Sequence, residues 1–232
     1  MTAAAPQGSE PSDSYAFPTV STGTEDGVVA GQHNELWKLP GTPDGALVYT
    51  TPKLARDVEL LGPASVDLWL GSTTTDTNLQ ATITEVRPDG QEVYVARGWL
   101  RASQRKLDVR ASTPTMPVQT DLQSDVQPLV PGQPTFMRFA VFPFDYVFRA
   151  GSRIRLIIDT PSQTGGWNFE PLADAGVNSI LHDAQHPSEI VVGTVYAAGP
   201  PAGRPACDTL LNQPCRPDAF TASDPPGELD WP

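Results

Sequence analysis

Short runs of alternating apolar and polar residues, separated by proline and glycine, limit the fold of this chain more than any other feature. The 232 residues include 25 prolines and 19 glycines, and 39% of the chain is apolar. No stretch of about a dozen residues carries the i, i+3, i+4, i+7 apolar spacing of an amphipathic helix. Because proline and glycine interrupt helices and favour turns, the pattern predicts short strands around one large all-β core.

Alternation with a period of two identifies the strands. In residues 65–71, the side chains of Val66, Leu68 and Leu70 share one face, as expected of a half-buried strand. Further strands are expected at residues 46–51, 57–61, 78–87, 92–103, 135–142, 153–159, 177–182 and 189–196.

Two of these strands allow a more specific prediction. Residues 135–142 carry apolar side chains on both faces, which is typical of a strand in the middle of a sandwich. In residues 153–159 the aliphatic side chains are predicted to point inward, whereas Arg153, Arg155 and Asp159 are predicted to point outward.

Turn residues and one long connection join the strands. Gly62-Pro63 predicts a turn that separates the 65–71 strand from the strand before it. Pro88-Asp89-Gly90 predicts a hairpin between the two strands that flank it. Residues 106–132 are polar and contain four prolines. A connection of this length is expected to wrap the surface or to contact a partner.

The chain therefore divides into three predicted parts. Residues 1–44 are polar and are expected to form a mostly irregular N-terminal arm. Residues 45–198 hold about nine strands and predict an all-β fold, a β-sandwich of the jelly-roll kind. Residues 199–232 form a tail rich in proline.

The net charge of −12 disfavours binding to nucleic acids and to anionic membrane surfaces. There is no apolar run of about 18 residues that could span a membrane. The start of the chain has neither the basic nor the apolar region of a secretory signal. Cys207 and Cys215 could close a small disulfide ring or remain free thiols, and a disulfide would favour an extracytoplasmic setting.

The sequence carries no established catalytic or metal-binding motif. No serine lies in a Gly-x-Ser-x-Gly elbow, and Gly151-Ser152 is better explained as a turn before a strand. His182 and His186 are four residues apart, but Pro187 disfavours a helix, so surface loop histidines are expected and a weak metal site is the alternative. The sequence thus predicts no catalytic residue, no metal ligand and no cofactor.

Aromatic residues are the remaining candidates for contact with a ligand or a partner. Trp167 and Phe169 lie in a glycine-containing loop, and Trp37 lies in a loop that could dock. The other candidates lie on or after predicted strands and are Trp69, Trp99, Phe144 and Tyr146. Such side chains can form a sugar-binding face, the docking surface of another domain, or part of the core.

Several segments, taken in order, resemble the C-terminal domain of X-Pro dipeptidyl-peptidases and cocaine-esterase-like hydrolases. They are Leu54–Pro63, Val66–Leu70, Asp76–Leu79, Glu85–Gly90, Gly98–Ser103, Phe148–Leu156 and His186–Ile190. The resemblance covers roughly residues 45–196. It implies a galactose-binding-like jelly roll that packs against an α/β-hydrolase domain, which carries the catalytic triad in that family.

We therefore expect a non-catalytic module of a serine hydrolase that supports the hydrolase and helps to shape access to its active site. The alternative is a free-standing module that binds a carbohydrate or a cell-surface ligand through loop aromatics such as Trp167. A docking module should expose an apolar patch of about several hundred Å².

Overall fold

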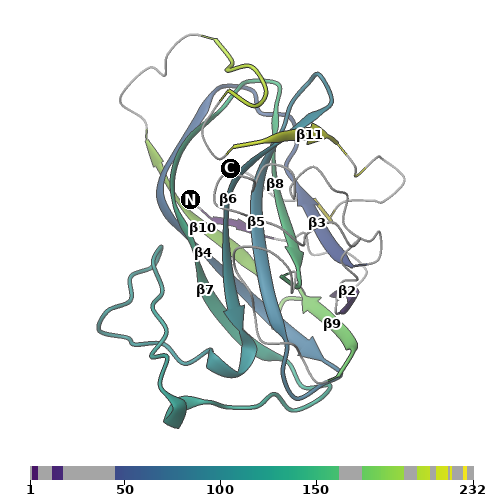
Figure 1. The fold of residues 1–232 in the computed structure, drawn as a ribbon, viewed down its shortest axis with the longest axis vertical. Helices are drawn as coiled ribbons and strands as arrows, with labels where there is room; N and C mark the ends of the chain where they lie inside the picture. The colour runs from purple at the N-terminus through teal and green to yellow at the C-terminus, as the bar shows by residue number, and fades with distance from the viewer. Residues whose placement is uncertain are drawn as a thin grey trace.

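The computed structural model describes residues 2–4, 12–17, 45–161, 174–195, 203–209, 213–218, 220 and 227–228. These residues form two six-stranded sheets that pack face to face (Figure 1). Their helical content is limited to two 3-10 turns, Ala102–Gln104 and Gln123–Asp125. None of the described helices is long and apolar enough to cross a membrane.

The first sheet has β4 (Val58–Ser72) at its centre. Its order is β1 (Thr2–Ala4), β10 (Glu189–Val195), β4, β9 (Gly176–Leu181) and β2 (Ser12–Phe17), and β7 (Thr135–Phe148) also pairs with β4. The second sheet has the order β11 (Cys215–Pro217), β6 (Gln91–Arg101), β5 (Asn78–Val86), β8 (Arg153–Asp159), β3 (Ala46–Thr50) and β12 (Gly227–Glu228). All described pairings are antiparallel except the short β12–β3 pair. The all-β sandwich is confirmed, and the jelly-roll order stays a prediction.

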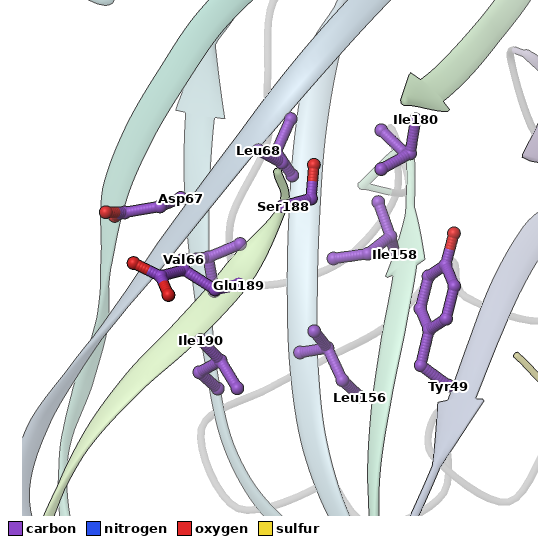
Figure 2. Close-up of a pocket in the computed structure, with 10 residues that line it drawn as sticks. All are labelled: Tyr49, Val66, Asp67, Leu68, Leu156, Ile158, Ile180, Ser188, Glu189 and Ile190. Atoms are coloured by element: carbon purple, nitrogen blue, oxygen red, sulfur yellow. The ribbon is translucent and has the colours of Figure 1, made fainter. Parts of the chain in front are cut away.

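The core lies between the inner faces of the two sheets. Figure 2 shows side chains of β4 and β8 that point into the same space, whereas Asp67 points to the other side of β4. A cavity of about 20 Å³ remains there, with room for about one water molecule. Because its lining is mainly aliphatic, the cavity is a gap in packing that offers a ligand few polar partners.

The predicted turn at Gly62-Pro63 is wrong, because β4 runs through it. The pairing of β4 with β7 shifts its register between Gly62 and Ala64, which marks a bulge. Gly62 has a φ of +103°, a conformation that favours glycine, and Pro63 is tolerated where regular pairing is interrupted. The hairpin at Pro88-Asp89-Gly90 is confirmed, since it joins β5 to β6.

The predicted central position of residues 135–142 is also wrong. Among the described strands, β7 pairs with β4 alone, and its other side approaches β6 of the opposite sheet. At that crossing, a Cβ atom on Gly98 of β6 would lie only 2.0 Å from the backbone oxygen of Ala140. The apolar outer residues of β7 therefore reflect an apolar outer surface instead of burial on both faces.

Both ends of the chain contribute strands to the sandwich. Residues 1–44 were expected to be mostly irregular, but they contain β1, which pairs with β10, and β2, which pairs with β9. In the tail, β11 pairs with β6 and β12 pairs with β3. β2 forms because Tyr15 and Phe17, two positions apart, both bury their rings in the sandwich, where each is only 2% exposed. The predicted domain boundaries at 44 and 198 remain predictions.

We expect Gly98→Ala to destabilise the fold by ~3 kcal/mol or more, because the added methyl group meets backbone that cannot move without breaking the sheet contact. Equilibrium denaturation in urea measures this. The matched control is Gly71→Ala in β4, where the nearest atom to a new Cβ is 3.7 Å away. Equal stability of the two variants would contradict a close β6–β7 crossing.

Candidate docking surface

The structure describes only some of the aromatic contact residues predicted from the sequence. Trp37, Trp167 and Phe169 lie outside the described residues. Tyr146 is only 6% exposed, and its hydroxyl donates a hydrogen bond of 2.8 Å to Glu85. Burial, followed by the nearby Glu85 carboxylate, raises the pKa of Tyr146. Tyr146 therefore belongs to the interior of the fold.

An apolar surface follows the outer face of β7, a strand on which the sequence did not place one. Phe136, Arg138, Ala140 and Phe142 occupy alternate positions on this strand, opposite to the buried Met137, Phe139 and Val141. Phe136 is 39% exposed and Phe142 is 49% exposed. The signal is present in the sequence as apolar residues on both faces of 135–142, but the same pattern is typical of a strand in the middle of a sandwich.

Two tryptophans extend this surface to the neighbouring strands. The ring of Trp69 on β4 lies 5.4 Å from that of Phe136, and the ring of Trp99 on β6 lies 5.3 Å from that of Phe142. We call the four aromatic residues of these two pairs the β7 ridge, namely Trp69, Trp99, Phe136 and Phe142. The ridge crosses the closed edge where the two sheets meet, and the guanidinium of Arg97 lies 5.2 Å from the ring of Trp99.

The long connection of residues 106–132, here called the arm, lies beside β7 (Figure 1). The side-chain amide of Gln119 donates a 2.8 Å hydrogen bond to the backbone oxygen of Arg138. The backbone N–H of Leu129 donates one of 2.7 Å to the backbone oxygen of Thr75. The arm is therefore attached to the sandwich at several points. It nevertheless exposes four large apolar side chains, which are Val109, Met116, Leu122 and Val130.

The charge of this part of the chain differs from that of the whole. Residues 97–142 contain six basic and three acidic side chains, in a chain with a net charge of −12. Several of these charges are paired, including Arg138 with Asp67 and Lys106 with Asp125. The segment that contains most of β7, most of the ridge and the arm therefore carries a net positive charge in an acidic chain.

The sequence segments that carry the family resemblance form structural contacts. Asp76, from one segment, accepts hydrogen bonds from Arg101 Nε at 2.7 Å and from the backbone N–H and hydroxyl of Ser103 at 2.9 and 2.7 Å. Both donors belong to another segment, Gly98–Ser103. This carboxylate therefore fixes the start of β5 to the end of β6.

A second carboxylate joins β5 to the turn before β8. Glu85 is 1% exposed and accepts from Arg87 Nε at 3.1 Å and from the backbone N–H of Arg149 at 3.2 Å, in addition to Tyr146. Beside it, Asp57 accepts from the Ala150 N–H at 2.7 Å and from Arg149 at 2.8 Å. The Ala150 bond first, and then that of Arg149, lower the pKa of Asp57.

A third carboxylate holds the C-terminal tail on the outer face of the second sheet. Glu92 is completely buried and pairs with Arg155 at 3.2 Å and with Arg216 at 2.8 Å. Arg155 also pairs with Asp218 at 2.6 Å, and it is 3% exposed. The side chain of Arg155 thus points away from the core, as predicted, but it is buried because the tail covers it.

A disulfide between Cys207 and Cys215 closes the tail into a ring. This is one of the two states that the sequence left open. The ring is also held to the sandwich, because Arg87 donates a hydrogen bond to the backbone oxygen of Pro205 and Arg204 donates one to Ser152 Oγ.

The described residues offer no arrangement of a serine hydrolase triad. His182 pairs with Asp13 at 3.1 Å and His186 pairs with Asp183 at 3.0 Å, but neither ring is hydrogen-bonded to a serine hydroxyl there. His182 is 6% exposed, so the expectation of a surface loop position is wrong for it. Ser152 lies in the turn before β8, as predicted. In the same part of the chain, no group of three potential metal ligands is found.

This arrangement defines an all-β sandwich domain with an apolar outer ridge. The sequence pattern of the X-Pro dipeptidyl-peptidase C-terminal non-catalytic domain matches residues 20–191, and the chain belongs to that family.

Relatives and solved structures agree with this assignment. A Mycobacterium bovis protein whose name describes a serine esterase is 33% identical over 114 residues, which are 48% of this chain and 18% of that protein. The cocaine esterase of a Rhodococcus species is 28% identical over 161 residues, 64% of this chain and 25% of the esterase. The fold is shared with a CocE/NonD family hydrolase from Staphylococcus aureus, with a TM-score of 0.55 at 21% identity over 65% of this chain and 33% of the hydrolase. This chain thus corresponds to about a fifth to a third of the length of these proteins.

We expect Asp76→Asn to cost about 2 kcal/mol of stability, because the neutral amide weakens the charge-assisted bonds from Arg101 and Ser103. The midpoint of chemical denaturation measures the change. Asp145→Asn, at an exposed site on β7, is the control and should change stability by less than about 0.5 kcal/mol. If both variants behave alike, Asp76 does not anchor the hairpin.

Proposed function

We propose that this chain is a non-catalytic accessory domain of a serine hydrolase. Membership of a family described as non-catalytic is the observation that carries the proposal. The lack of a triad among the described residues supports it. The hydrolysis of an ester, amide or X-Pro peptide would then be performed by an α/β-hydrolase domain, to which this domain contributes support and a wall near the active site.

We propose that the β7 ridge and the arm form the surface that packs on the hydrolase domain. Large exposed apolar side chains are unfavourable in water, and a cluster of them on one edge is typical of an interface. Interfaces between domains of one chain usually bury about 600–1,500 Å². Trp69, Phe136, Phe142 and Trp99, together with the apolar side chains of the arm, would supply the buried centre of such an interface.

The purified chain is expected to resist labelling by a fluorophosphonate probe and to show no hydrolysis of p-nitrophenyl esters above the buffer rate. Intact-protein mass spectrometry detects the covalent adduct, and an active serine esterase treated in parallel shows that the probe works. A stoichiometric adduct on any serine of this chain would overturn the non-catalytic assignment.

The exposed ridge should bind apolar dyes in the isolated domain. Phe136→Ser with Phe142→Ser is expected to lower the fluorescence of bound anilinonaphthalene sulfonate. The melting temperature should fall only slightly, because both side chains lie outside the core and each loses one contact with a tryptophan ring. Val177→Ser removes an equally exposed side chain from β9 and serves as the control. An unchanged dye signal in the double variant would argue against the ridge as an apolar docking surface.

A further inference from the structure

The outermost strand beside β9 is supplied by a segment that the family pattern does not include. β2 pairs antiparallel with β9 at six positions, from Ser12 opposite Leu181 to Phe17 opposite Gly176. The family pattern begins at residue 20. Within the range that the family pattern matches, no described strand covers the outer edge of β9, and a short segment from outside that range occupies it in this chain.

Three alternate residues of β2 point towards the sandwich, and each has its own set of contacts. Asp13 accepts a hydrogen bond of 3.0 Å from the Tyr49 hydroxyl and lies 3.1 Å from His182 Nε2. Tyr15 donates to the backbone oxygen of Asp159 at 3.3 Å and accepts from Asn178 Nδ2 at 3.0 Å. These contacts tie β2 to both sheets.

The third residue, Phe17, fills a socket that depends on glycine. A Cβ atom on Gly176, the pairing partner of Phe17, would lie 2.9 Å from the phenyl ring and 2.7 Å from Thr73 Oγ1. The ring is 2% exposed. The edge of β9 therefore has a backbone ladder, a polar anchor for a carboxylate and two buried aromatic positions, which are the elements of strand-addition sites for peptides.

The covalent connection does not determine which copy of the segment fills this site. Twenty-eight residues separate Phe17 from Ala46 at the start of β3. A stretch of that length can span on the order of 90 Å when extended, far more than the width of one sandwich. Its tether raises the local concentration of β2 only to about the millimolar range, so another copy can compete.

We infer that the edge of β9 is an acceptor groove for an extended segment of the pattern Asp-x-Tyr-x-Phe, and that Ser12–Phe17 is its exchangeable occupant. A second copy of the chain can supply this segment in trans. The backbone pairs give affinity for any extended peptide, and the positions of Asp13, Tyr15 and Phe17 give selectivity. This groove is separate from the β7 ridge, and the inference does not depend on the proposed function.

Cysteine cross-linking can test the exchange, because Ser14 Oγ and Ser179 Oγ lie 2.7 Å apart across the β2–β9 pair. One chain carries Ser14→Cys. The other carries Ser179→Cys together with Tyr15→Ala and Phe17→Ala, so that its own segment binds weakly. After mixing under oxidised glutathione, we expect a disulfide-linked dimer between positions 14 and 179, identified by peptide mass spectrometry.

Three controls make the result decisive. Ser14→Cys with Ser179→Cys in one chain must form the bond internally, which checks the geometry. Ser12→Cys in place of Ser14→Cys is two positions out of register and should cross-link at least about tenfold more slowly, since diagonal neighbours are further apart. Ser179→Cys with β2 intact should form the dimer more slowly, and it keeps the test valid if the alanine variant does not fold.

A synthetic peptide of residues 9–20 with Cys at position 14 provides the second arm. Ser179→Cys chains should capture it, and the same peptide with Ala at positions 15 and 17 should be captured at least about tenfold less. The inference is overturned if the internal bond forms readily while neither a second chain nor the peptide is captured at millimolar concentration. Equal capture of both peptides would overturn the aromatic selectivity.

Discussion

Burial of two apolar sheet faces against each other determines where every other part of this domain must lie. β4 presents its aliphatic face to β5 and β8, and the residues between these strands are almost completely buried. Two packed sheets have edges, and an uncovered edge leaves a row of unpaired backbone groups. The bulge at Gly62, the close crossing at Gly98 and the short terminal strands can all be understood as ways to close or cover these edges.

Three carboxylates hold the hairpin of β5 and β6 together and attach it to the rest of the fold. Asp76 connects its open end, Glu85 connects it to the β7–β8 turn, and Glu92 connects it to β8 and the tail. Each carboxylate accepts bonds from arginine or from backbone N–H groups, so burial of its charge is compensated. Segments that identify the family are therefore explained by structure, because they hold strands together at the ends of the sandwich.

Much of this fold could be predicted from local pattern. The strand at 153–159 and the hairpin at Pro88-Asp89-Gly90 follow from alternation and turn residues, which act over a few positions. The turn expected at Gly62-Pro63 failed because a bulge and a turn use the same residue types. Only the partner strand decides between them.

The surface was harder to predict than the fold. Phe136 and Phe142 gave the same alternation signal that a buried strand gives, and burial depends on neighbours that the sequence does not name. The covering of Arg155 by a tail more than 60 residues away, at Asp218, has no local signal at all. Tyr146 was a candidate for contact or for the core, and its burial decides for the core.

The position of Arg216 and Asp218 in the chain has a consequence for biosynthesis. Glu92 and Arg155 are completed by partners that leave the ribosome well after both of them. Until then, the second sheet carries charged groups on strands that are otherwise ready to pair, and such intermediates are prone to association. Arg216 and Asp218, which directly follow the ring closed by Cys207 and Cys215, end this interval when they pair with the sheet.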